Sequence, residues 1–270
     1  MNPRGLVLAV LLFAVIAPLP ARELRVCADP NNLPYSSRDQ QGLENRLMEL
    51  IGKDLHMQVE YTWWAQRRGA LRNTINAGRC DIVPGIASSI EGLATTRPYY
   101  RASYVFLARQ GSEWAQIRSF DDPRLRQARI GVQLVGDDGA NTPPAHALSR
   151  RGIVEHVRGY MIYGNYAEQA PQAAIAQAVA EGQIDIAVVW GPTAAYFAPR
   201  QSVPLSLVPV SPWLDGPQWP MAFDISMGVR RDDVQLRLAL DAALKRNEAA
   251  IGLLLHEYGL DTAAHTPAPM

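Results

Sequence analysis

The fold is decided by two short stretches that repeat one pattern, NAGRCDI at Asn76–Ile82 and AEGQIDI at Ala180–Ile186. Each stretch contains a helix end, a glycine, and an aspartate that leads into an apolar run. Glycine is favoured just after a helix because it adopts the left-handed backbone conformation without steric cost. The repetition predicts two similar α/β units. A chance recurrence of helix-stop chemistry is the alternative reading.

Strand-like and helix-like segments alternate around both stretches. Short apolar runs bounded by turn residues indicate strands, and apolar residues spaced by three or four indicate helices. The first unit is expected to contain strands at 24–28, 57–63 and 80–83 and helices at 43–55 and 70–77. The second is expected to contain strands at 128–134, 154–163 and 184–190 and helices at 146–151 and 170–180. This alternation is typical of mostly parallel sheets flanked by helices.

The remaining segments connect and complete the two units. The extended run at 104–108 suits a crossing from one lobe to the other, and two further strands are expected at 205–210 and 222–229. A long helix over 234–258 needs a lobe to pack on, so we expect it to return to the first. The predicted organisation is a first lobe at 22–107, a second lobe at 108–209, a return to the first lobe at 210–262, and a disordered tail at 263–270.

The N-terminus has the features of a secretory signal peptide over residues 1–21. Arg4 precedes an apolar run at Leu6–Ile16, and Ala21 supplies a small residue at the expected cleavage point. We therefore expect export to the periplasm and no membrane insertion after cleavage. The 270-residue chain carries 26 basic and 26 acidic residues, a balance that predicts no nucleic-acid partner.

The only two cysteines are Cys27 and Cys80. In an oxidising compartment an even number of cysteines favours a disulfide, which here closes a loop of about fifty residues. Two buried free thiols are the alternative.

Signals for catalysis, metals and cofactors are absent from the sequence. The five histidines show no metal-ligand spacing, and there is no nucleophile elbow, phosphate-cradling glycine loop or dinucleotide fingerprint. We predict no catalytic residues, no metal site and no cofactor. Asp137 and Asp138 either contact a cation or polar ligand, or shape a turn.

Several motifs resemble periplasmic solute-binding proteins of ABC importers with the two-lobed, type II-like fold. They are Pro34-Tyr35, the step from Gly78 to Asp81, Arg97-Pro98-Tyr99 and the final helix. Three longer segments, 25–34, 61–69 (YTWWAQRRG) and 95–106, resemble one subgroup, the quinoprotein-dehydrogenase-associated binding proteins, which include the J protein of methanol oxidation systems. The resemblance implies a partner, a periplasmic PQQ-dependent alcohol dehydrogenase with or without its cytochrome c, which such proteins are thought to help mature or activate.

In this fold a ligand lies between the lobes, at the carboxyl ends of the strands. The polar and aromatic residues expected in the cleft, or in contact with a partner, are Asn31, Asn32, Tyr35, Trp63, Trp64, Arg67, Ser88, Ser89, Arg97, Gln133, Asp137, Trp190 and Tyr196. Because strand side chains alternate, Trp63 and Trp64 are not both expected in the core. Arg97 is either an anion contact or a solvated or structural arginine.

Amino-acid receptors of this fold hold the ligand carboxylate with an arginine and the ammonium with an aspartate. The corresponding positions here are Gly92 and Trp190. Because a desolvated ligand charge must be paired, this pattern argues against an amino-acid ligand. We therefore expect a non-catalytic accessory protein of a quinoprotein dehydrogenase. The alternatives are an importer receptor for a small non-amino-acid organic ligand and, least favoured, an enzyme such as a dehydratase.

Overall fold

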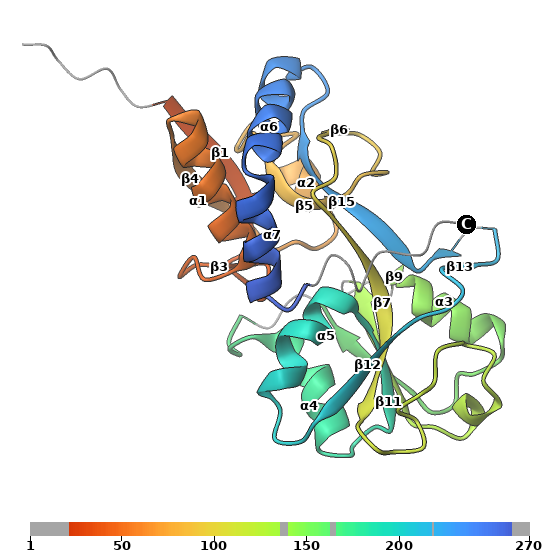
Figure 1. The fold of residues 1–270 in the computed structure, drawn as a ribbon. Helices are drawn as coiled ribbons and strands as arrows, with labels where there is room; N and C mark the ends of the chain where they lie inside the picture. The colour runs from red at the N-terminus through yellow and green to blue at the C-terminus, as the bar shows by residue number, and fades with distance from the viewer. Residues whose placement is uncertain (1–21, 136–139, 163–165, 218, 261–270) are drawn as a thin grey trace, which may run out of the picture.

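The chain forms two lobes joined by long strands (Figure 1). The computed structural model describes residues 22–135, 140–162, 166–217 and 219–260. The predicted signal peptide and tail lie outside these residues. The first lobe contains β1 (Arg22–Ala28), β2 (Asn31–Asn32), β3 (Ser36–Ser37), α1 (Leu43–Leu55), β4 (Met57–Trp63), α2 (Ala70–Asn73), β5 (Val83–Ala87), β6 (Ala94–Thr95), α6 (Val234–Arg246) and α7 (Glu248–Glu257).

The second lobe contains the central part of the chain. Its strands are β8 (Ile130–Val135), β9 (Ala140–Asn141), β10 (Val157–Met161), β11 (Ile186–Trp190), β12 (Leu205–Pro209), β13 (Leu214–Asp215) and β14 (Trp219–Pro220). Its helices are α3 (Pro143–Arg150), α4 (Ala174–Ala180) and α5 (Gly191–Phe197), with 3-10 turns η1 (Pro123–Arg126), η2 (Pro171–Ala173) and η3 (Ala198–Arg200).

Two long strands, β7 (Tyr100–Arg109) and β15 (Ala222–Val229), run from one lobe to the other (Figure 1). The first part of β7 pairs antiparallel with β15, and its second part pairs antiparallel with β11 and β12. A single hydrogen-bonded sheet therefore continues through both lobes, in the strand order β10-β8-β11-β7-β15-β5. The sheets are mixed: β1 and β4 pair parallel, as β8 does with β10 and β11, whereas the crossing strands add antiparallel pairs.

The internal repeat is confirmed at the level of individual contacts. Gly78 and Gly182 both have positive φ, +69° and +72°. In the first lobe the Asp81 N–H donates to the Arg25 carbonyl at 2.7 Å, and the Asp81 carboxylate accepts from the Arg25 guanidinium at 2.7 and 2.8 Å. In the second lobe Asp185 makes the same contacts with Arg129, at 2.8 Å for the backbone bond and 2.6 and 3.1 Å for the guanidinium.

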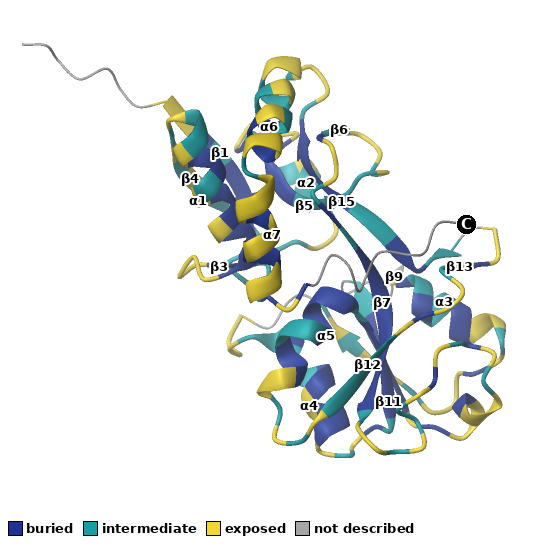
Figure 2. Ribbon diagram, viewed as in Figure 1, coloured by how far each residue is buried: buried dark blue, intermediate teal, exposed yellow. Residues whose placement is uncertain are grey.

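Each lobe has its own apolar core. In the first, residues of α1 such as Leu47 and Ile51 pack against Leu240 of α6 and Leu255 of α7. The two C-terminal helices thus share the core of the first lobe. In the second, two clusters cover the two faces of its sheet. Figure 2 shows buried residues along β7, β11 and the inner faces of the helices, with exposed residues on the outer turns.

Strand β7 contributes to the cores of both lobes. Ala102 belongs to the core of the first lobe, and Tyr104 belongs to that of the second. The disulfide between Cys27 and Cys80 is present, with Cα atoms 5.5 Å apart and both residues buried. It joins the end of β1 to the turn that precedes β5.

Two expected elements of the first unit differ from the structure. The helix predicted over 70–77 ends at Asn73, because the side chains of Asn73 and Thr74 donate to the carbonyls of Gly69 and Ala70 and compete with the helical pattern. The strand predicted over 80–83 begins only at Val83. Before it, Ile82 forms a single parallel bridge to β1.

The long C-terminal helix predicted over 234–258 is two helices rather than one. They meet at Asn247, whose side-chain amide donates to the Ala243 carbonyl at 2.9 Å. Side-chain bonds of this kind compete with the regular backbone ladder.

Candidate functional site

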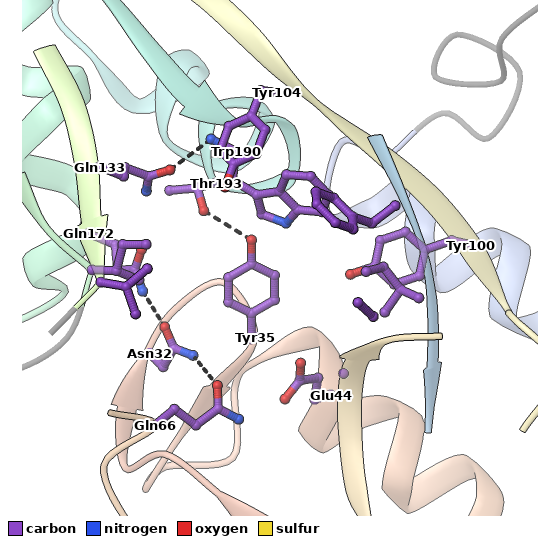
Figure 3. Close-up of a pocket in the computed structure, with 16 residues that line it drawn as sticks. Asn32, Tyr35, Glu44, Gln66, Tyr100, Tyr104, Gln133, Gln172, Trp190 and Thr193 are labelled. Carbon is purple, nitrogen blue, oxygen red and sulfur yellow. Dashed lines mark hydrogen bonds between the residues drawn. The ribbon is translucent and has the colours of Figure 1, made fainter. Parts of the chain in front are cut away.

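A cavity of about 270 Å³ lies between the lobes (Figure 3). Its walls are aromatic and amide side chains with some aliphatic groups. The residues that line it are Asn32, Tyr35, Glu44, Gln66, Gly85, Ala87, Tyr100, Tyr104, Gln133, Val135, Ile162, Gln172, Trp190, Thr193, Phe223 and Ile225. They include the predicted cleft residues Asn32, Tyr35, Gln133 and Trp190. The cavity thus lies where the strand ends of both lobes meet.

Direct hydrogen bonds connect the lobes around this cavity. Tyr35 Oη lies 3.0 Å from Thr193 Oγ1. Three further bonds join the segment Asp29–Asn32 to the second lobe: Asn31 Nδ2 to the Glu168 carbonyl (2.8 Å), Tyr166 Oη to Asp29 Oδ2 (3.0 Å), and Gln172 Nε2 to Asn32 Oδ1. The predicted pair Asn31 and Asn32 therefore contacts the opposite lobe.

Asp29 organises this segment. It is 1% exposed, and its carboxylate accepts the backbone N–H groups of Asn31 and Gln66, both at 2.8 Å. Asn32 Nδ2 in turn donates to Gln66 Oε1 at 3.3 Å. Since these bonds fix the loops after β1 and β4 together, they set the positions of Asn32 and Gln66 in the cavity wall.

Trp190 forms the opposite wall at the end of β11. Its backbone N–H donates to Gln133 Oε1 at 2.8 Å, and its ring packs edge-on against Tyr104 and Phe223, with centroids 5.2 and 5.9 Å away. Gly92, the other expected clamp position, is exposed, has a φ of +90° and does not line the cavity. Neither position supplies a charge for an amino-acid ligand.

Glu44 is a cavity residue that sequence reasoning missed. It lies in the first turn of α1 and is 4% exposed, and its Oε2 atom has no hydrogen-bond partner within the described parts of the chain. Its Oε1 atom packs so closely on Gly85 that a Cβ there would lie 2.0 Å away. Burial, with a smaller contribution from Asp29, raises the pKa of Glu44 to about 8. An acidic residue at a helix start is common, so the sequence carries no signal that this one is buried.

The two adjacent tryptophans are both half-buried and lie outside the first cavity. Trp63 stacks on Tyr61 at 4.7 Å, with the Arg38 guanidinium 5.7 Å from its ring. Trp64 lies under the Arg79 guanidinium, at 5.5 Å. Trp64 and the predicted residue Arg67 line a neighbouring cavity of about 410 Å³, which shares Gln66, Gly85 and Val135 with the first.

The other predicted residues are placed elsewhere. Ser88 Oγ lies 2.6 Å from Ser226 Oγ and also donates to the Asp224 carbonyl, and Ser89 is exposed. Arg97 is exposed, and its backbone N–H donates to Asp241 Oδ1 on α6. Tyr196 stacks on Tyr258 at 5.8 Å. Asp137 lies outside the described residues. A ligand or partner contact by any of these residues stays a prediction.

The chain matches the model of the bacterial extracellular solute-binding proteins, family 3, over residues 24–251. It belongs to this family. Within the family it is MoxJ-like: it is 32% identical to protein MoxJ of Methylorubrum extorquens, over 89% of this chain and 81% of that protein. Protein MoxJ of Paracoccus denitrificans is 26% identical over 93% of both chains.

A solved structure supports the same assignment. The crystal structure of the periplasmic binding protein XoxJ from Methylobacterium extorquens has a TM-score of 0.71 and 35% identity to this solute-binding protein, covering 88% of this chain and 97% of that one. Among the described residues, no helix has the length and apolar character to cross a membrane. Within the described residues there is also no group of three or more His, Cys, Asp or Glu side chains that could hold a metal ion.

Proposed function

We infer that this MoxJ-like protein is a non-catalytic periplasmic accessory protein. Its proposed role is to bind a PQQ-dependent alcohol dehydrogenase of the methanol-oxidising type and to assist its maturation or activation. The observation that carries this inference is the end-to-end similarity to MoxJ and XoxJ, which extends through both lobes. The predicted resemblance of segments 25–34, 61–69 and 95–106 to dehydrogenase-associated proteins supports it.

The chemistry of the cleft agrees with this role. A zwitterionic amino acid needs a cationic partner for its carboxylate, since an unpaired desolvated charge costs several kcal/mol. No arginine or lysine lines the interlobe cavity among the described residues, and Trp190 occupies the expected aspartate position. An amino-acid transport ligand is therefore disfavoured.

The surface offers a chemically suitable contact for a protein partner. Trp63 and Trp64 are half-buried, and each pairs with an arginine at the surface. Tryptophan and arginine are the residues that most often dominate binding energy at protein interfaces. We place the dehydrogenase contact at this segment, which belongs to the motif that distinguishes the subgroup.

Crosslinking in the periplasm, followed by co-purification, tests the proposal. The protein should capture the dehydrogenase, and Trp64→Ala should reduce the yield at least several-fold. Leu253→Ala, at an exposed apolar residue on α7, serves as the matched control and should not. Failure of the unaltered protein to capture the dehydrogenase would contradict the proposal.

An importer receptor for a small organic ligand is the second candidate, favoured by the family membership and by the presence of an interlobe cavity. Permease and ATPase genes beside this gene, rather than those of a dehydrogenase and a cytochrome c, would favour it.

A further inference from the structure

Glu44 is the one carboxylic acid among the described residues that line the cavity. It is buried, and one of its carboxyl oxygens has no hydrogen-bond partner in the described parts of the chain. A buried polar atom normally has a hydrogen-bond partner, and a buried carboxylate normally has a counter-ion. Oε2 of Glu44 has no such partner within the described residues. Figure 3 shows its carboxyl group directed toward the space between Tyr35 and Tyr100.

The other walls of the cavity suit a positive charge. Tyr35, Tyr100, Tyr104, Trp190 and Phe223 all line it, and the negative faces of aromatic rings attract ammonium groups. No basic side chain lines it among the described residues. Three arginines, Arg67, Arg68 and Arg72, line the neighbouring cavity instead.

We propose that the interlobe cavity binds a small organic cation, a protonated amine with a short apolar group, with Glu44 as its counter-ion. The ammonium group would donate to the Glu44 carboxylate, while the aromatic rings and aliphatic residues such as Ile225 would cover the apolar part. The volume of about 270 Å³ corresponds to about nine water molecules at about 30 Å³ each, so the site suits a small ligand. A metal ion fits less well, because hard cations take about six or more oxygen ligands and the cavity has one carboxylate.

The surroundings of Glu44 couple binding to a proton. The titratable groups that interact with it electrostatically are Asp29, Tyr61, Tyr99 and Tyr100, and none of them is cationic. Burial raises the pKa of Tyr99 and Tyr100, so both stay neutral at ordinary pH. With its pKa at about 8, Glu44 is mostly protonated at pH 7 and must release a proton when a cation binds. Binding should therefore strengthen about tenfold per pH unit from pH 6 to 8 and then level off.

Isothermal titration calorimetry with three probes of similar size, n-propylammonium, n-propanol and propionate, tests this. We expect the ammonium ion to bind most tightly and to release close to one proton at pH 7, which makes the measured enthalpy depend on the buffer. Glu44→Gln should weaken its binding at least tenfold and abolish the proton release. Glu49→Gln, at an exposed residue of the same helix, should change neither.

Three results would overturn the proposal: no saturable binding of n-propylammonium, equal or tighter binding of propanol or propionate, or unchanged binding in Glu44→Gln. The proton count in the unaltered protein decides the matter even if the variant folds poorly. The inference does not rest on the proposed dehydrogenase association. Amine binding is measured on the isolated protein and crosslinking is measured without the amine, so either proposal can fail while the other holds.

Discussion

Replacing Glu44 with glutamine should make the protein more stable at neutral and alkaline pH. The folded protein holds the Glu44 proton up to about pH 8, whereas the unfolded chain releases it near pH 4.5. Between these values folding takes up a proton, so every pH unit removes about 1.4 kcal/mol of stability. The stabilising contribution is complete below pH 4.5 and is lost by about pH 8, a total on the order of 5 kcal/mol.

Glutamine has nearly the same shape as glutamate and no charge, so the stability of the variant should lack the pH dependence that comes from Glu44. The two proteins should have similar stability near pH 5, and the variant should gain about 1 kcal/mol or more per unit as the pH rises. Urea unfolding at pH 5, 6, 7 and 8, followed by the fluorescence of the six tryptophans, measures the difference.

Glu49→Gln is the control, since Glu49 is exposed on the same helix and pairs with Lys53. The difference in unfolding free energy between Glu49→Gln and the unaltered protein should show no comparable rise with pH. Parallel stability curves for Glu44→Gln and the unaltered protein would refute the assignment of a buried, protonated Glu44.

Two further predictions concern the links within and between the lobes. Cys27→Ser together with Cys80→Ser opens a loop with a sequence separation of 53 and should lower the unfolding free energy by about 4 kcal/mol; an unchanged urea midpoint would contradict this. Tyr35→Phe together with Gln172→Ala removes two of the bonds between the lobes, each worth about 1 kcal/mol. Small-angle X-ray scattering should then show a larger radius of gyration, and an unchanged value would mean that these bonds do not hold the lobes together.

Local sequence signals predicted most of the fold. The glycine and aspartate of each repeated stretch make equivalent contacts, because Gly78 and Gly182 require a positive φ and the aspartates face an arginine one strand away. The division of the C-terminal helix at Asn247 was not predictable from apolar spacing, since that spacing continues across the break. The same holds for the early end of α2, which depends on side-chain bonds of Thr74.

The site was predictable only where residues follow strand ends. Asn32, Tyr35, Gln133 and Trp190 were found in this way, since the topology brings strand ends together. Glu44 was missed because its burial depends on Gly85, forty-one positions further along the chain, whose missing side chain makes room for the carboxyl group. Packing between distant segments leaves no local signal at either residue.

Dehydrogenase activity in a strain that lacks this gene tests the central claim most directly. We predict a low specific activity of the periplasmic PQQ-dependent alcohol dehydrogenase at an unchanged level of its polypeptide, restored when the gene is returned. Normal activity in the deletion strain would contradict the proposed accessory role.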